Sequence, residues 1–412
     1  MDIVAKTVWK SAYRLEVEVS AGDRKDVLYY ESDEALWENP PATDDFAAVA
    51  LCQYCSNKKA DLYIDGTVTE SVLFNLDEFL KIWVNWRPDL FSPISIRAKN
   101  VVKDTPNRKK SAVLAFSGGV DACFSLAAHQ KKLLGASSRE IGLGVLIVGY
   151  DLKSDQKTAI DLAYEGAKKA LNAFNVPCAV IETNWQQAFC PDWLMGSIAG
   201  VAGVLQTLAG AYSAGILSSD FNYLQELKMK PYGSHMMINH FLGSYMFPIV
   251  TTGGTHTRIE RIGVIKNYLE LIRNLRVCWQ SEGGGTNCGV CEKCVRTRLE
   301  MMINGMEPDI FRLPMGPEKI EKMDISYYIP FRYFEDIYLN FPKDHPLYAV
   351  IEKTYLRESQ NQDKEASLVN RINTKNKEIS LLKEEMNAIR NSKSYRITKP
   401  LRFVRKFFKK PV

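Results

Sequence analysis

The sequence predicts an α/β protein with a doubly wound, mostly parallel sheet, a small α+β domain before it and a helix after it. Between residues 111 and 305, short apolar runs alternate with segments of helical spacing, the pattern of a parallel sheet with helices on both faces. Segments of period-two alternation precede this region, and a heptad pattern follows it. The predicted segments are therefore 1–105, 111–305, 306–360, 365–390 and 391–412.

The composition is that of a globular protein with two or three domains. The chain has 412 residues, of which 46% are hydrophobic and 25% charged. It contains no apolar run long enough to span a membrane and does not begin like a signal peptide, so a cytoplasmic location is expected.

The net charge of +5 is concentrated at the C-terminus. Of the 53 basic residues, eight fall in residues 391–412, where there is no acid, so the rest of the chain carries 45 basic against 48 acidic residues. A nearly neutral body argues against a broad nucleic-acid-binding face.

Residues 1–105 are expected to form the small α+β domain. Period-two alternation and turn signals place strands at 13–19, 27–30, 60–64 and 97–102, with a helix at 71–86. The third strand is expected to end at an Asp65-Gly66 turn. Cys52 and Cys55 have no second pair nearby, so they are interpreted as ordinary helix or loop cysteines.

The region 111–305 is expected to carry the main sheet. Strand candidates are 112–116, 141–148, 178–181, 216–219, 247–251 and 275–278. Helix candidates are 120–134, 155–174, 197–214, 235–244 and 258–273. Ligands of such sheets bind at the carboxyl ends of the strands, where the residues 117–121, 149–151, 182–184, 218–220 and 252–256 are expected to gather.

A glycine turn follows the first of these strands. The predicted ligand-binding residues there are Ser117, Gly118, Gly119, Val120 and Asp121. A tight turn into a helix N-terminus presents free backbone N–H groups and a positive dipole to an anion. Ser117 can donate a hydroxyl hydrogen bond to phosphate, and Asp121 can hold a divalent cation or cap the helix.

This stretch resembles the Ser-Gly-Gly-x-Asp-Ser signature of the PP-loop ATP pyrophosphatases. The resemblance implies a HUP-like fold, ATP and Mg²⁺ as cofactors, and cleavage of ATP between its α and β phosphates. Ser117 and Asp121 would then be catalytic. Ala122 stands where the family has Ser, which removes one hydroxyl near the pyrophosphate.

Further polar residues follow later strand candidates. Backbone groups at Gly149 and Tyr150 are expected to contact the adenine ring. Arg258 begins a helix facing the carboxyl edge of the sheet, where a cation can neutralise phosphate charge. For Arg261 and Lys266 the alternatives are such a role or a surface salt bridge.

Four cysteines cluster late in the chain. The candidate metal ligands are Cys278, Cys288, Cys291 and Cys294. A Cys-x-x-Cys-x-x-Cys run places three thiolates around a tight knuckle, and Gly289 permits the turn. Zn²⁺ held by four thiolates is the prediction, with an iron–sulfur cluster as the alternative.

The glycine turn followed by this cysteine pattern resembles the 7-cyano-7-deazaguanine synthase family. That family adenylates a carboxylate, forms an amide with ammonia and dehydrates it to a nitrile, and its four cysteines bind zinc beside the active site. The resemblance covers residues 111 to about 305. It implies ATP and zinc binding, whereas the substrate is left open.

The C-terminal part has three predicted pieces. Residues 306–360 are rich in proline and aromatic residues and are expected to pack irregularly. Residues 365–390 carry a heptad pattern: Glu365, Leu368, Ile372, Lys375, Ile379, Leu382, Met386 and Ile389. It predicts either a coiled-coil homodimer or a single amphipathic helix.

Residues 391–412 form a basic tail in which aromatic and aliphatic residues interleave with cations. Such a segment can lie on an anionic membrane surface, and a solvated tail or a nucleic-acid contact is the alternative. The stretch 394–402 resembles C-terminal tails of bacterial glycosyltransferases that build surface polysaccharide. That resemblance implies work near the inner membrane.

The functional hypothesis is an ATP-dependent, AMP-forming enzyme that activates a carboxylate or amide for attack by a nitrogen nucleophile. Its expected partner is a small-molecule or sugar-linked carboxylate. A sulfur transferase of the PP-loop class is the alternative among enzymes, although the neutral body fits RNA binding poorly. A degenerate ATP-binding scaffold is the alternative of another class, favoured by Ala122.

Overall fold

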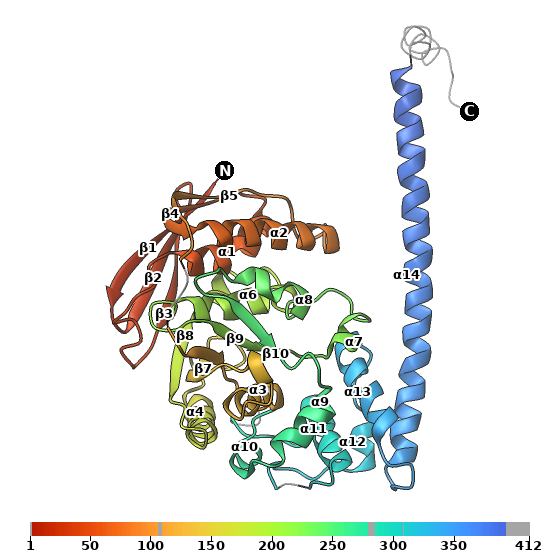
Figure 1. Ribbon diagram of the computed structural model, residues 1–412. Helices are drawn as coiled ribbons and strands as arrows, with labels where there is room; N and C mark the ends of the chain where they lie inside the picture. Colours follow the sequence, from red (N-terminus) through yellow and green to blue (C-terminus); the bar gives the residue numbers. More distant parts are fainter. Residues whose placement is uncertain (1, 106–108, 279–284, 308, 393–412) are drawn as a thin grey trace, which may run out of the picture. The chain divides into compact units, whose positions relative to one another are not determined.

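A computed structural model of the chain is drawn in Figure 1. The structure describes residues 2–105, 109–278, 285–307 and 309–392, without the side chains of residues 9 and 10 and of several residues between 362 and 380. The chain divides into two compact units, Met1–Glu352 and Lys353–Val412. The two cavities and the cysteine cluster described below lie in the first unit.

One ten-stranded sheet runs through the first unit in the order β10-β9-β6-β7-β8-β3-β2-β1-β4-β5. Its strands are β1 (Ile3–Ser11), β2 (Arg14–Ala21), β3 (Arg24–Glu31), β4 (Leu62–Thr69), β5 (Ile96–Val102), β6 (Ala112–Ala115), β7 (Ile141–Val148), β8 (Cys178–Thr183), β9 (Gly215–Ser218) and β10 (Ile249–Thr252). Neighbours from β10 to β8 and from β1 to β5 are parallel, whereas β2 and β3 pair antiparallel. An α/β protein with a mostly parallel sheet is therefore confirmed.

The helices connect these strands. The longer ones are α1 (Asp45–Lys58), α2 (Glu70–Trp86), α3 (Val120–Gln130), α4 (Lys157–Asn172), α6 (Trp193–Gln206), α9 (Arg258–Ile265), α11 (Glu292–Ile303), α13 (Tyr328–Asn340) and α14 (Tyr348–Asn391). The shorter ones are α5 (Trp185–Ala188), α7 (Tyr223–Glu226), α8 (Met236–Asn239), α10 (Leu269–Arg273), α12 (Pro317–Glu321), and the 3₁₀ turns η1 (Gly135–Ser137) and η2 (His240–Leu242).

The helices cover both faces of the sheet, as Figure 1 shows. On β6, Val113 packs into one core with residues of α1, α2 and α6, whereas Ala112 and Leu114 pack into another with α3 and α4. Successive side chains of a strand point to opposite faces. A strand buried on both faces reads as an uninterrupted apolar run, which is why β6 could be recognised in the sequence.

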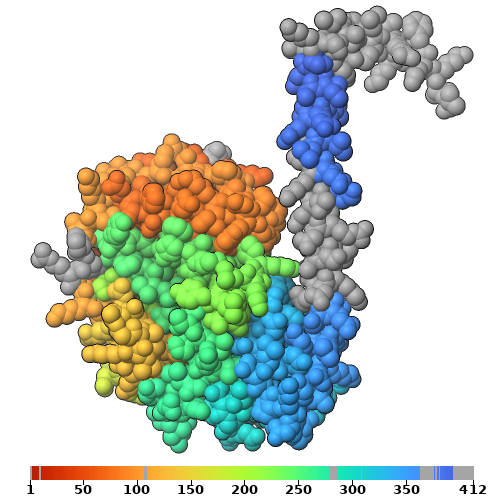
Figure 2. All heavy atoms as spheres, turned by 45° about the vertical axis from the view of Figure 1, so that its right-hand side comes forward, coloured from red at the N-terminus to blue at the C-terminus, as the bar shows by residue number. Residues whose placement is uncertain are grey.

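The N-terminal five strands and the later five belong to the same sheet. They meet where β3 pairs antiparallel with β8, through Tyr30 with Thr183 and Glu31 with Glu182. Above the sheet, α1 packs so closely on α6 that a Cβ at Gly203 would lie 3.0 Å from that of Ala50. Figure 2 shows the orange N-terminal segment directly against green residues of the later segment. The predicted boundary near residue 105 thus falls between β5 and β6 of one sheet.

Three elements of the N-terminal segment differ from the prediction. The helix α1 was not predicted because its residues from Phe46 to Cys52 are all buried, so they show no amphipathic stripe. The predicted turn at Asp65-Gly66 is wrong, because β4 continues through these residues to Thr69, with a shift in register against β5. The first strand, β1, was also missed.

In the later segment most elements lie where the sequence places them, with three corrections. Residues 275–278 are not a strand. The predicted helix at 235–244 is α8 followed by η2, and that at 258–273 is two helices, α9 and α10.

The irregular packing expected for residues 306–360 is wrong, because α12, α13 and the start of α14 lie there. Apolar residues of α13 are buried at helical spacing, Phe331, Phe334 and Ile337 among them.

The second unit consists largely of one helix. The helix α14 extends to Asn391 and includes the predicted segment 365–390. The heptad side chains that the structure describes there are exposed: Lys375, Ile379, Leu382, Met386 and Ile389. The tail from residue 393 lies outside the described residues. Within the described chain, no helix is both long and apolar enough to cross a membrane.

Candidate functional site

The glycine turn lies at the point where the strand order reverses. From β6 the chain continues to β7 and β8 on one side and then to β9 and β10 on the other. Gly118 adopts φ +75°, which only glycine accepts readily. Gly119 is the N-cap of α3 and provides no side-chain cap, so the first N–H groups of the helix face outward. This is the usual place for a ligand in an open α/β sheet.

A cavity of about 410 Å³ opens beside this turn. Ser117, Gly119, Val120 and Asp121 line it, and so does Ala122. The other described residues used below that line it are Tyr150, Asp151, Trp193, Asp220, Arg258, Arg276, Cys278, Lys293, Arg296 and Tyr333. Gly118 and Gly149 are not among the lining residues. The volume is within the range of small-ligand sites.

Asp121 is the centre of a partly buried ion network. Its Oδ1 accepts a hydrogen bond from Arg261 at 2.6 Å, and its Oδ2 lies 3.8 Å from the Nε of Arg258. Arg258 also donates to Glu300 and, at 3.1 Å, to the hydroxyl of Thr297. Arg258 thus lies close to Asp121, and Glu300 and Thr297 of α11 hold its guanidinium.

Arg261 is completely buried, so a surface salt bridge is wrong for it. Besides Asp121, its guanidinium donates to the carbonyls of Ser219, Phe221 and Gly253. These bonds join the ends of β9 and β10 to α9. Arg261 therefore fixes Asp121 and the strand ends, whereas Lys266 lies exposed near the carbonyl of Asn304.

Two acids near this network have raised pKa values. Burial, helped by the charge of Asp121, raises the pKa of Asp220 to about 6. Burial likewise raises the pKa of Glu300 to about 7, against the opposing effect of Arg258. Acids with pKa values near neutrality are typical of functional sites. The Asp220 side chain has no hydrogen bond or ion pair among the described residues.

The residues after β7 have different roles. Tyr150 lines the cavity, 6% exposed, with its ring at the edges of Trp185 and Trp193. Gly149 has φ +98°, and a Cβ there would collide with the carbonyl of Thr183. Gly149 is thus needed to let β7 and β8 lie close together.

Other polar residues at strand ends are not brought to the cavity. Asn184 instead bonds to Val27 and Tyr29 of β3. His235 does not cap α8 with its side chain: it is buried, 2.7 Å from the carboxylate of Glu226. Among residues 252–256, Thr252 bonds to His129.

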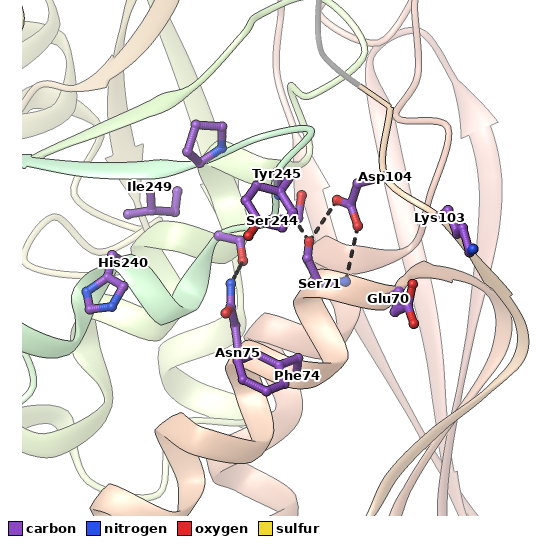
Figure 3. Close-up of a pocket in the computed structure, with 12 residues that line it drawn as sticks. Glu70, Ser71, Phe74, Asn75, Lys103, Asp104, His240, Ser244, Tyr245 and Ile249 are labelled. Atoms are coloured by element: carbon purple, nitrogen blue, oxygen red, sulfur yellow. Dashed lines mark hydrogen bonds between the residues drawn. The ribbon is translucent and has the colours of Figure 1, made fainter.

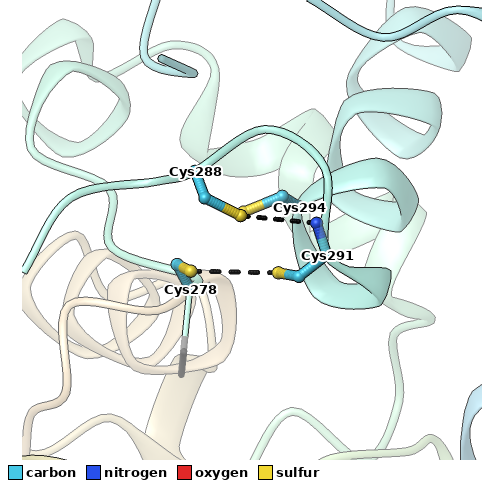
Figure 4. A group of neighbouring side chains, drawn as sticks. All are labelled: Cys278, Cys288, Cys291 and Cys294. Atoms are coloured by element: carbon cyan, nitrogen blue, oxygen red, sulfur yellow. Dashed lines mark hydrogen bonds between the residues drawn. The ribbon is translucent and has the colours of Figure 1, made fainter. Parts of the chain in front are cut away.

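The four cysteines converge on one point, as Figure 4 shows. All four are buried, and their sulfur atoms lie within 4.8 Å of one another. The Cys278–Cys291 and Cys288–Cys294 sulfur distances are both 3.8 Å. Four thiolates at about 2.3 Å from one tetrahedral ion lie about 3.8 Å apart. The cluster can therefore bind a single metal ion such as zinc.

The backbone around the cysteines is shaped for this cluster. The N–H groups of Val290 and Cys291 point at the sulfur of Cys288, at 3.4 and 3.3 Å. Gly289 has φ +87°, and a Cβ there would collide with the carbonyl of Leu313. The side chain of Asn287 accepts from the N–H groups of Val277 and Cys278. Hydrogen bonds from the Cys294 thiol lower the pKa of Cys291 to about 5.

The residues that sequence reasoning did not assign are the cavity-lining Arg276, Lys293, Arg296 and Tyr333. Arg276 lies two residues before Cys278, and Lys293 and Arg296 flank Cys294. Basic residues this close to predicted metal ligands, in a region predicted to bind ATP, were the available signal. Tyr333 gave none, since it lies on a helix that was not predicted.

A second, larger hollow, lined by residues other than those of the first cavity, is shown in Figure 3. It has a volume of about 750 Å³ and lies beside α2, η2 and the end of β5. Its polar groups bond to one another: Asp104 accepts from Ser71 at 2.7 Å, and Asn75 donates to the carbonyl of Gly243 at 2.8 Å. Phe74 and Tyr245 are exposed at its rim.

Comparisons of the chain with protein families, with curated proteins and with solved structures found no match.

Proposed function

We propose that this chain is an AMP-forming, ATP-dependent enzyme with a HUP-like PP-loop domain. The observation that carries the proposal is the glycine turn Ser117–Gly119, which lies at the reversal of strand order beside a cavity that Arg258 and Cys278 of the four-cysteine cluster also line. The backbone N–H of Val120 and that of Gly119, which now donates to the Ser117 hydroxyl at 3.3 Å, would bind phosphate oxygens, and Ser117 would donate its exposed hydroxyl.

Mg²⁺ fits the acids of this cavity. Asp121 and Asp220 both line it, and the charge of Asp121 helps to raise the pKa of Asp220, an effect that a divalent cation between them would remove. Arg258 would neutralise charge on the α-phosphate. The adenine would lie on the side of Gly149 and Tyr150. ATP and Mg²⁺ supply the leaving group and its charge neutralisation, and these residues position them.

The proposed reaction begins with attack of a carboxylate or amide oxygen on the α-phosphorus. Pyrophosphate leaves, and a nitrogen nucleophile then displaces AMP. The substrate would be a small or sugar-linked carboxylate, from deazaguanine or surface-polysaccharide chemistry.

Product analysis tests this reaction. Incubation with ATP, Mg²⁺ and candidate acids should yield AMP and pyrophosphate, and Asp121→Asn should lower the rate at least 100-fold. Ser117→Ala should lower it about 10-fold, whereas Ser137→Ala, in an exposed turn, should leave it unchanged. Formation of ADP would contradict the proposal.

A degenerate ATP-binding scaffold is the second candidate, and Ala122 favours it. Ala122 is 4% exposed and lines the cavity, so the hydroxyl that the PP-loop signature places there is missing from the site itself. Calorimetry separates the two: ATP binding without turnover supports the scaffold. Gain of turnover in Ala122→Ser would then identify the missing hydroxyl as the cause.

The four-cysteine cluster is proposed to hold structural Zn²⁺. Four protein thiolates leave no open position for catalysis, and their close spacing suits one ion better than an iron–sulfur cluster. Elemental analysis should find about one zinc per chain. Iron together with sulfide would favour the cluster, and neither metal would remove the site.

The heptad face of α14 is proposed to pair with a second copy of the chain. Ile379, Leu382, Met386 and Ile389 are exposed at three- and four-residue spacing. Light scattering should show a dimer that Leu382→Glu disrupts. Leu381→Glu is the matched control, since Leu381 is equally exposed but lies off this spacing. A monomeric wild-type chain would contradict the pairing.

The basic tail is proposed to contact anionic membrane. Deleting residues 391–412 should abolish co-sedimentation with vesicles containing anionic lipid, since each cation contributes about 1 kcal/mol. Unchanged co-sedimentation would refute the idea.

A further inference from the structure

Three cations of the cavity are not used by the Asp121 network, and Arg296 is the most unusual of them. Arg296 is 5% exposed, yet its Nη1 has no hydrogen-bond partner among the described residues. Its guanidinium stacks 3.9 Å above the ring of Tyr333, and its Nε lies 3.0 Å from a carboxylate oxygen of Glu292. Leaving a buried guanidinium N–H unpaired is costly, so this group is prepared for a ligand of the cavity.

Arg276 and Lys293 line the same cavity. The backbone N–H of Arg276 donates to the carbonyl of Gly118 at 2.8 Å, and its Nη1 lies 3.4 Å from the carbonyl of Ser117. Lys293 is close enough to Asp220 to oppose the rise in that carboxyl's pKa. The three cations are thus grouped next to the turn proposed to bind phosphate.

Both segments that carry these cations are attached to the cysteine cluster. Cys278 follows Arg276 by two residues. Cys291 is the N-cap of α11, so Lys293 and Arg296 occupy the first turns of that helix. A metal ion on the four sulfurs would therefore hold all three cations at once, and through Arg276 it would also hold the glycine turn.

The charges indicate the class of ligand. Arg258 is paired with Glu300, and Arg261 with Asp121 and backbone carbonyls. With Mg²⁺ on Asp121 and Asp220, three cations of the cavity would remain: Arg276, Lys293 and Arg296. The acids that oppose their charge are the exposed Asp151 at the rim and Glu292, which contacts Arg296. An excess of cations beside a phosphate site suits a multiply charged oxyanion.

We propose that Arg276, Lys293 and Arg296 form a pyrophosphate-binding subsite that receives the β and γ phosphates of the nucleotide, and that the four-cysteine cluster holds this subsite in place. The inference rests on the proposed function. It adds a second role for the metal, which builds the leaving-group half of the cavity without touching the ligand.

Calorimetry with inorganic pyrophosphate and with AMP, in the presence of Mg²⁺, tests the subsite. Arg296→Gln should weaken pyrophosphate binding at least 10-fold and leave AMP binding unchanged. Arg298→Gln is the matched control, because Arg298 lies on the same helix but stacks on Phe311 outside the cavity. Far-UV circular dichroism checks that both variants are folded.

Each outcome decides between the hypotheses. Unchanged pyrophosphate affinity in Arg296→Gln, or an equal loss in Arg298→Gln, would overturn the subsite while leaving an ATP enzyme possible. A loss of AMP binding but not of pyrophosphate binding would place Arg296 at the AMP half of the nucleotide and would likewise overturn the subsite. If the wild-type chain binds neither ATP nor pyrophosphate, the proposed function itself fails.

The role of the cluster needs a separate measurement. After chelation of the metal, pyrophosphate affinity should fall at least 10-fold, whereas AMP affinity and the circular dichroism of the sheet should persist. Unchanged pyrophosphate affinity in the metal-free protein would show that the cluster does not hold the subsite.

Discussion

The chain contains the Cys-x-x-Cys spacing in two regions with opposite surroundings. Cys52 and Cys55 lie within α1, in the core, where the sulfur of Cys52 contacts the carbonyl of Val49. Cys288 and Cys291 lie just before α11, where free N–H groups point at the Cys288 sulfur. Inside a helix the N–H groups are already bonded, so none can stabilise a thiolate.

The comparison shows that backbone conformation decides what the spacing means. Burial raises the pKa of Cys52 to about 12, so that cysteine behaves as a small apolar side chain. At the knuckle, Gly289 turns the chain and a third and fourth sulfur converge. A Cys-x-x-Cys pair indicates a metal only where glycine and further ligands accompany it.

The sharpest test of this difference is metal content. Cys291→Ser should reduce bound zinc from about one per chain to a tenth or less, since three thiolates leave the tetrahedral site open. Cys52→Ser should retain the full content. Elemental analysis after gel filtration measures both, and equal metal contents in the two variants would abolish the distinction.

Alkylation should separate the two regions almost as strongly. In folded protein stripped of metal, iodoacetamide at pH 9 should label the cluster, while Cys52 stays unlabelled. The expected difference follows from the pKa of Cys52, which is about 12. Below that pH the buried Cys52 remains a neutral thiol, and only a thiolate reacts with iodoacetamide. Peptide mass spectrometry reads the labels, and early modification of Cys52 would contradict its assignment to the core.

Metal removal should lower the melting temperature by roughly 10 °C. Binding free energy at a structural zinc site is also folding free energy, and about 1 kcal/mol corresponds to about 2–4 °C in a large domain. Chelator should not shift the melting of Cys288→Ser, which has already lost the ion. Identical scans of wild type with and without chelator would refute a structural role.

Gly289→Ala should have the smallest effect, about 2–4 kcal/mol of unfolding free energy. Its left-handed φ and the collision with the carbonyl of Leu313 add together. Gly305→Ala isolates the cost of the left-handed φ, because Gly305 has φ +69° with nothing within 4 Å of an added Cβ. The expected loss of unfolding free energy there is about 1 kcal/mol. Denaturant unfolding measures both, and equal costs would disprove crowding at the knuckle.

Local patterns were sufficient to predict much of the sheet and both glycine turns. The strands β6 and β7 are continuous apolar runs, and the turn at Gly118 and the knuckle at Gly289 need glycine, so each has a signature within a few residues. The helix α1 had none, because it is buried on all sides. Arg261 and Arg296 look like surface cations in the sequence. Only the packing of α9 against α3, and of α11 against α13, shows that they are buried.

The junction of β3 with β8 has a consequence for truncated forms of the chain. Removing residues 1–105 would leave β8 as an open edge of a parallel sheet, with unpaired N–H and C=O groups where Tyr30 and Glu31 now bind. The same cut would uncover the face of α6 on which Ala50 packs. A bare edge beside an apolar surface is a template for aggregation. In this chain we therefore expect the N-terminal strands also to protect residues 111–305 from self-association.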